Sequence, residues 1–211
     1  GKKVVLVNCS GSPVGLVPET ASCQAILQAW YPGQAGGKAV ADVLFGEYNP
    51  SGKLPVTFYK NVNQLPDFED YNMTGRTYRY FEGEPLYAFG HGLSYTTYTY
   101  GEVQAPATAK TDETIVVSVP VTNSGNMDGD EIVQLYLKKK GDEEGPIKTL
   151  RAFKRVHIPA GQTVNVELEL TPSQLEWWNP ATNSMNTHAG NYEVMVGGNS
   201  KDVKSVEIAL Q

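Results

Sequence analysis

The chain has 211 residues, of which 40% are hydrophobic, and it carries a formal net charge of −6 at pH 7. This size and composition are typical of one large or two small globular domains with a proper core. The acidic balance excludes the basic stripe that nucleic-acid binding needs, and no apolar run approaches the ~20 residues of a membrane-spanning helix. We therefore expect no nucleic-acid partner and no membrane span.

The first residues predict the start of an α/β unit. Residues 3–8, KVVLVN, form a near-continuous apolar run, which is typical of a strand buried on both faces of a parallel sheet. The chain opens on this strand without a methionine, so we expect it to be a piece of a longer protein. In residues 21–30 the apolar side chains have the spacing of a helix, and we expect a short helix there.

The glycine-rich stretch YPGQAGGKAVADVLFG, residues 31–46, invites comparison with a phosphate-binding loop. Only three residues separate Gly33 from Gly37, whereas the nucleotide-binding motif needs four. Ala39 stands where the motif requires Ser or Thr to hold magnesium. We therefore interpret the stretch as a second helix that begins near Gly37 and ends with Gly46 as its cap.

After this helix, residues 54–58 (LPVTF) predict a short extended piece at a sheet edge, because Pro55 cannot donate to a ladder. One strand, two helices and an edge piece cannot close a core. We therefore interpret residues 1–59 as the C-terminal part of an α/β domain whose other strands lie upstream.

Residues 60–101 form a connector that is rich in Tyr, Phe and Gly. A flexible linker would be small and polar, so this composition predicts a segment that packs along both of its neighbours.

Residues 102–211 switch to a period of two. The segments with this pattern are TIVVSVPVTN, EIVQLYLKK, TVNVELEL, NYEVMVGG and DVKSVEIAL. Turn sequences such as NSGNMDGD, GDEEGP and PAGQ separate them. Several short alternating strands in ~100 residues predict an antiparallel sandwich of the immunoglobulin-like kind, and the missing cysteine pair favours the fibronectin type III-like form.

The cysteines and histidines do not suggest a metal site or a catalytic triad. Cys9 and Cys23 are too far apart for a zinc motif. Two buried thiols are the simpler interpretation, and a disulfide between them stays open. The three histidines, His91, His157 and His188, are scattered along the chain, so no nucleophile and base are predicted.

Two groups of side chains are candidates for sugar chemistry. Trp177 and Trp178 could stack on pyranose rings, although one of two neighbouring strand residues must face inward. Several carboxylates could be paired for acid/base catalysis, but they lie in turn-like sequence where ordinary acidity is expected. They are Asp67, Glu69, Asp70, Glu82, Glu84, Asp128 and Asp130.

Four long motifs resemble the C-terminal region of glycoside hydrolase family 3. They are AILQAWYPGQAGGKAVADVLFGEYNPSGKLPVTF, RTYRYFEGEPLYAFGHGLSYTTY, VTNSGNMDGDEIVQLYL and LRAFKRVHIPAGQTVNVELEL. The resemblance covers essentially the whole chain and implies the end of an α/β sandwich domain, a connector and a fibronectin type III-like domain. It also implies a β-glucosidase or β-xylosidase, and the form of the connector is closer to the xylosidase branch.

The resemblance further implies that the chemistry lies elsewhere. Family members are retaining, exo-acting enzymes without a cofactor. Their nucleophilic aspartate lies in an N-terminal barrel domain, and their acid/base glutamate usually lies upstream of the strand at residues 3–8. We therefore assign no catalytic residue in this chain and expect it to be inactive alone, with an oligosaccharide as the substrate of the intact, periplasmic or secreted enzyme.

Two alternatives remain open at this point. The chain could be a non-catalytic carbohydrate-binding module, which an exposed aromatic strip around Trp177 and Trp178 would favour. It could also be a structural spacer. In either case the open edge of the first strand predicts self-association through the truncated α/β end.

Overall fold

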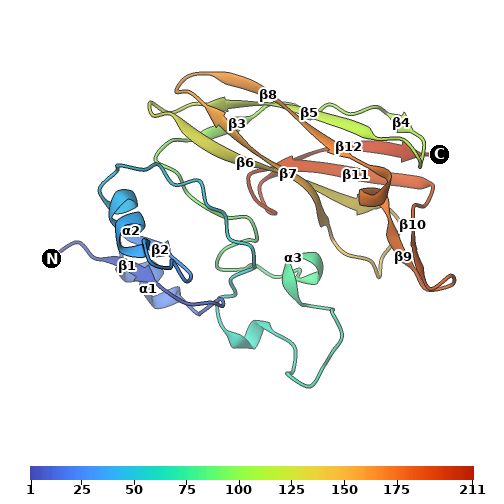
Figure 1. The fold of residues 1–211 in the computed structure, drawn as a ribbon. Coiled ribbons are helices and arrows are strands. Elements are labelled where there is room, and N and C mark those ends of the chain that lie inside the picture. Colours follow the sequence, from blue (N-terminus) through green and yellow to red (C-terminus); the bar gives the residue numbers. More distant parts are fainter.

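The computed structural model describes residues 1–211. Figure 1 shows a small α/β unit at the N-terminal end, a larger β-sandwich at the C-terminal end, and a long connector that runs between them. None of the helices combines the length and the apolar character that crossing a membrane requires. The predicted order of an incomplete α/β unit followed by an all-β sandwich is confirmed, whereas the boundaries at residues 59 and 101 stay predictions.

The α/β unit contains two parallel strands and two helices. Strand β1 (Val5–Asn8) pairs in parallel with β2 (Ala25–Gln28), and their partners run in step along all four residues. Helix α1 (Val17–Ser22) connects the two strands, and α2 (Gly36–Leu44) follows them. The other edge of β1 is unpaired, as expected for a sheet that lacks further strands.

The helix predicted over residues 21–30 is wrong. Helix α1 ends at Ser22, and the apolar residues that follow form β2 instead. Three apolar residues in a row fit a buried strand as well as a helical face, and here backbone pairing with β1 decides between them. The second predicted helix is confirmed as α2, and Gly46 follows its end with φ +82°, a conformation that glycine adopts without strain.

The connector is ordered by contacts with both neighbours. It contains a 3₁₀ turn (Val62–Gln64) and the short helix α3 (Thr77–Tyr80). The extended piece predicted at residues 54–58 pairs with it. The backbone N–H of Leu54 donates to the carbonyl of His91 at 2.8 Å, and that of Phe58 donates to Tyr87 at 3.0 Å.

The sandwich consists of two sheets and a short hairpin, and all of its strand pairs are antiparallel except β4 with β12. One sheet has the order β4-β12-β11-β6-β7, the other has the order β3-β5-β8, and β9 pairs with β10. A 3₁₀ turn (Pro172–Leu175) precedes the hairpin. The strands are β3 (Tyr98–Tyr100), β4 (Thr108–Ala109), β5 (Ile115–Asn123), β6 (Gly129–Lys139), β7 (Thr149–Ile158), β8 (Thr163–Leu170), β9 (Trp177–Asn179), β10 (Ser184–Asn186), β11 (Gly190–Gly197) and β12 (Val203–Leu210).

The alternating apolar residues predicted for the sandwich strands form the core between the two sheets. In β5 the side chains of Val117, Val119 and Val121 are fully buried between the sheets, and the inward residues of β6 face them. Strand β7 was not predicted. Its pairing with β6 contains a register shift between Leu135 and Tyr136, which interrupts the regular alternation on which strand prediction depends.

The connector covers the outer face of β6. Tyr136 points away from the core of the sandwich, yet it is fully buried, because Tyr78 and Phe89 of the connector pack against its ring. Tyr78 and Phe89 are themselves stacked, with ring centroids 4.2 Å apart. The predicted packing of the connector along both neighbours is therefore confirmed.

A buried ion pair also joins the two parts. The ammonium group of Lys53 lies 3.1 Å from the carboxylate of Glu131, and the side chains are only 14% and 4% exposed. The hydroxyl of Tyr100 donates to the same carboxylate at 2.8 Å, and burial raises the pKa of Tyr100, which keeps this donor protonated. This ion pair therefore connects the segment that follows α2 to strand β6 of the sandwich.

Both cysteines are free thiols, which settles the open question of a disulfide. Cys23 is half-buried, but Cys9 is exposed just after β1. The interpretation of two buried thiols is therefore wrong for Cys9, because this residue follows the end of β1 and lies outside the strand pairing with β2.

Candidate functional site

The two predicted tryptophans point to opposite faces of β9. Trp177 is 7% exposed. Its ring is stacked on that of Tyr192, with centroids 6.3 Å apart, and its centre lies 4.4 Å from the guanidinium of Arg151. Trp178 is 57% exposed and lies opposite Met185 of β10. Stacking of a sugar on these rings stays a prediction, and only Trp178 presents an open ring for it.

Three of the candidate carboxylates, Asp70, Glu84 and Asp130, do not have the environment of a general acid. A hydrogen bond from the backbone of Asn72 lowers the pKa of Asp70, and a hydrogen bond from Lys201 lowers the pKa of Glu84. A glycosidase acid needs a raised pKa instead, so that it carries a proton near neutral pH. The same downward direction holds for two further carboxyl groups, those of Glu113 and Asp130.

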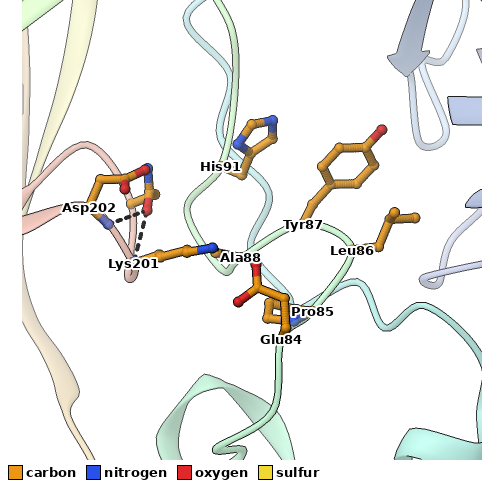
Figure 2. Close-up of a pocket in the computed structure, with 9 residues that line it drawn as sticks. Glu84, Pro85, Leu86, Tyr87, Ala88, His91, Lys201 and Asp202 are labelled. Atoms are coloured by element: carbon orange, nitrogen blue, oxygen red, sulfur yellow. Dashed lines mark hydrogen bonds and ion pairs between the residues drawn. The ribbon is translucent and has the colours of Figure 1, made fainter.

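A cavity of about 310 Å³ lies between the connector and the turn that joins β11 to β12. Figure 2 shows Lys201 of this turn reaching toward Glu84, with which it forms an ion pair. The rings of Tyr87 and His91 lie nearly parallel, 5.0 Å apart, and burial lowers the pKa of His91. The lining residues are Glu84, Pro85, Leu86, Tyr87, Ala88, His91, Asn199, Lys201 and Asp202.

This cavity does not present a reactive group. Glu84 and Lys201 neutralise each other, and Asp202 accepts a hydrogen bond from the side chain of Asn199 at 3.0 Å. The lowered pKa favours the neutral form of His91, which makes it a packing partner of Tyr87 rather than a cation.

A second cluster lies where β1 and β2 end. The side-chain amide of Asn8 donates to Gln28 at 2.6 Å and to Ser10 at 2.9 Å. Gln28 in turn donates to the carbonyl of Ser10 at 3.1 Å. Open α/β sheets bind their ligands at the carboxyl ends of parallel strands, so this is the edge at which the chain can contribute to a binding site.

Two aromatic residues extend this edge. Trp30, with φ +54°, occupies the left-handed region that bulky residues rarely adopt, and such strain is found at functional sites. Tyr31 is 79% exposed, and its ring lies directly over Gly11, where a Cβ would collide with it. We refer to Asn8, Ser10, Gln28, Trp30 and Tyr31 as the strand-end cluster.

The strand-end cluster was not predicted from the sequence, because residues 21–30 were interpreted as a helix. Recognising AILQ as a second parallel strand would have placed the two polar strand ends side by side. A larger cavity of about 700 Å³, lined mainly by apolar residues, lies beside this unit, and Trp30, Phe58 and Tyr87 belong to its walls.

Residues 1–95 match the model of the glycosyl hydrolase family 3 C-terminal domain, and residues 131–200 match that of the fibronectin type III-like domain. The chain belongs to glycoside hydrolase family 3. The two matches fall on the α/β unit with its connector and on the sandwich, respectively, so the family and the fold agree.

Curated relatives of this family 3 chain are glycosidases. It is 56% identical over 213 residues to a xylan 1,4-beta-xylosidase of Xylanibacter ruminicola, covering 100% of the chain and 24% of that protein. It is 38% identical over 224 residues to a periplasmic beta-glucosidase of Salmonella typhimurium, with 100% and 29% covered. The chain therefore spans 24% and 29% of the lengths of these two relatives.

Solved structures show the same fold. A beta-D-glucoside glucohydrolase of Trichoderma reesei matches with a TM-score of 0.89 and 27% identity, over 99% of this chain and 34% of that one. A b-glucosidase of Erythrobacter marinus matches with a TM-score of 0.86 and 39% identity, over 98% and 28%. In both cases the match includes the α/β unit, the connector and the sandwich together.

Proposed function

We propose that the chain is the C-terminal part of a retaining, exo-acting β-glycosidase that removes terminal β-linked xylosyl units. The observation that carries this proposal is the 56% identity to a xylosidase along the whole chain, compared with 38% to a glucosidase. Hydrolysis of glucosyl units is the alternative within the same family.

The proposed mechanism needs two carboxyl groups about 5–5.5 Å apart, one as nucleophile and one as acid/base. The downward pKa shifts in this chain are the opposite of what the acid/base requires. We therefore place both catalytic groups outside the chain and expect the chain alone to be inactive. Its own contribution is the strand-end cluster as part of the substrate-facing wall, with the sandwich as its rigid support.

The proposal is tested by hydrolysis of p-nitrophenyl β-xyloside and β-glucoside. The 211-residue chain is compared with a longer polypeptide that includes the upstream barrel and the rest of the α/β domain. Activity in the longer polypeptide alone, with the xyloside as the better substrate, is the expected result. Hydrolysis by the 211-residue chain itself would overturn the placement of the catalytic groups, and a preference for the glucoside would overturn the substrate assignment.

A role in carbohydrate binding is a second candidate, and the exposed ring of Trp178 favours it. Aromatic rings supply large contact areas at little entropic cost. Replacement Trp178→Ala is expected to weaken binding to insoluble xylan without lowering the melting temperature, because the side chain is exposed. Unchanged binding would remove this second function.

We also propose a periplasmic or secreted location, which the named location of the Salmonella relative supports. The unpaired edge of β1 and the exposed side chains of Val4 and Val5 favour self-association of the chain when it is isolated. Light scattering across a range of protein concentrations tests this, and a monomer at all concentrations would refute it.

A further inference from the structure

Two arginines beside the sandwich have no acidic partner. Arg79 lies on α3, and Arg151 lies on β7. Every ion pair in the chain uses other cations, so neither guanidinium lies within 4.0 Å of a carboxylate oxygen. The Nε atom of each is buried and makes no hydrogen bond. A buried donor without an acceptor costs free energy, so each of these atoms calls for an acceptor.

A third unpaired donor lies beside them. The indole Nε1 of Trp177 is also buried without a partner, and the guanidinium of Arg151 lies 4.4 Å from the centre of this ring. Stacking on an aromatic ring holds a guanidinium flat and leaves its N–H groups directed outward along its edge. Three buried N–H donors without an acceptor therefore lie on α3, β7 and β9, and the contact between Arg151 and Trp177 joins two of them.

Backbone contacts fix the two arginines in position. The N–H of Leu150, next to Arg151, donates to the hydroxyl of Tyr78, next to Arg79, at 3.0 Å. The N–H of Ile147 donates to the carbonyl of Arg79 at 2.7 Å. Figure 1 shows α3 and the β9–β10 hairpin outside the two sheets of the sandwich, at the side from which the connector approaches. The segments that carry the two arginines are thus hydrogen-bonded to each other.

The electrostatics of this cluster favour an anion. Burial lowers the pKa of Arg151, and the positive charge of Arg79 lowers it further. Arg151 keeps one hydrogen bond, from Nη2 to the carbonyl of Glu176 at 2.9 Å, which does not neutralise its charge. The charge of Glu176 acts on Arg151 in the opposite direction, to a smaller extent, and forms no ion pair with it. Two partly buried like charges that form no ion pair repel each other, and a bound anion would relieve both the repulsion and the missing acceptors.

We propose that Arg79, Arg151 and the indole N–H of Trp177 form a binding site for a small oxyanion, such as the carboxylate of an acidic sugar. Guanidinium groups bind planar carboxylates and tetrahedral phosphates or sulfates through paired hydrogen bonds. A uronic acid in a saccharide and a free inorganic oxyanion present the same chemistry to this site. Such binding goes beyond hydrolysis of a neutral glycoside and does not depend on it.

The test is calorimetric titration of the 211-residue chain with sodium D-glucuronate, with sodium sulfate and with neutral D-glucose, at constant ionic strength set by sodium chloride. Saturable binding of an oxyanion, and none of glucose, is expected. Arg79→Gln and Arg151→Gln are each expected to weaken this binding at least tenfold. Arg155→Gln is the matched control, because Arg155 lies on the same strand, is exposed and already pairs with Asp130.

The results distinguish an acidic saccharide from an inorganic oxyanion as the ligand, and both of these from the absence of an anion site. Binding of glucuronate more tightly than sulfate identifies an acidic saccharide, and the reverse identifies an inorganic oxyanion. Binding of neither anion overturns the proposal, as does anion binding that Arg155→Gln weakens as much as the other two replacements. Circular dichroism of each variant checks folding, and Arg79→Gln, on a different element from Arg151, keeps the test decisive if one variant does not fold.

Discussion

The buried pair of Lys53 and Glu131 predicts a large and specific loss of stability when one partner is removed. In Glu131→Gln the side chain keeps its shape and can still accept from Tyr100, but the ammonium group of Lys53 loses its counter-charge. Lys53 is 14% exposed, and it keeps only neutral acceptors, namely the carbonyl of Gly92 at 3.3 Å and the amide oxygen in the place of Oε1 of Glu131 at 3.4 Å. Removing one partner of a buried pair costs about 3–5 kcal/mol, and the residual exposure of Lys53 places the expected loss at about 3 kcal/mol.

The assay is urea unfolding at pH 7 and 25 °C, with the free energy of unfolding compared at an unchanged m-value. The double variant Lys53→Met/Glu131→Gln should recover to within ~1 kcal/mol of the parent, because no unpaired charge remains. Glu207→Gln is the matched control, since its pair with Lys140 is exposed and worth ~1 kcal/mol or less.

Two results would refute the reasoning. A loss below ~1 kcal/mol for Glu131→Gln would mean that Lys53 is effectively solvated. A double variant no more stable than Glu131→Gln would mean that the loss does not come from the unpaired ammonium group.

Further predictions concern the backbone and pH. Gly92→Ala should destabilise the chain by ~2 kcal/mol or more in urea unfolding, because the new Cβ would overlap the carbonyl oxygen of Gly52; unchanged stability would contradict this close approach. Gly37→Ala in α2 should instead stabilise by ~0.5–1 kcal/mol, since open space surrounds it and helical alanine loses less entropy; a loss in the same assay would refute this. A hydrogen bond from His157 holds the pKa of Asp130 below its ordinary 3.8, so its stabilisation is present above pH 3.8 and is lost as the pH falls further. The melting-temperature difference between the parent and Asp130→Asn should therefore shrink below that pH, and a difference that grows there would be contrary to this sign.

The sandwich could be predicted because its strands carry their own signal. In TVNVELEL the apolar and polar residues alternate without interruption, so the sequence of this strand alone indicates which face is buried. The segment AILQ carries no such signal, because four residues are too few to separate a period of 3.6 from a buried strand. What makes it a strand is β1, twenty residues earlier in the chain, and local sequence does not contain that pairing.

The functional clusters could not be predicted for a related reason. The strand-end cluster exists only because β2 is a strand. Interpreting this short segment as a helix therefore prevented prediction of the whole cluster at the carboxyl ends of β1 and β2. In the proposed oxyanion site, Arg79, Arg151 and Trp177 come from three separate elements, and their significance lies in the partners that they do not have. An unpaired donor is a property of three-dimensional packing, which composition and spacing do not report.

The burial of Tyr136 bears on what the sandwich does in the proposed enzyme. A free-standing sandwich would present a polar outer face on β6, yet here Gln134 and Tyr136 are buried on it, and the hydroxyl of Tyr136 donates to Gln134 at 2.6 Å. Gln134 in turn donates to the carbonyl of Gly198 at 2.5 Å, which ties this face to the turn after β11. The connector therefore covers this face of β6, and the rings of Tyr78 and Phe89 make the contact. Since β6 is buried on both faces, its position depends on the connector, and the sandwich and the α/β unit therefore support the substrate-facing wall together. A substitution at the contact of Tyr78 and Phe89 with Tyr136 should therefore alter the position of the strand-end cluster, although these residues do not contact it.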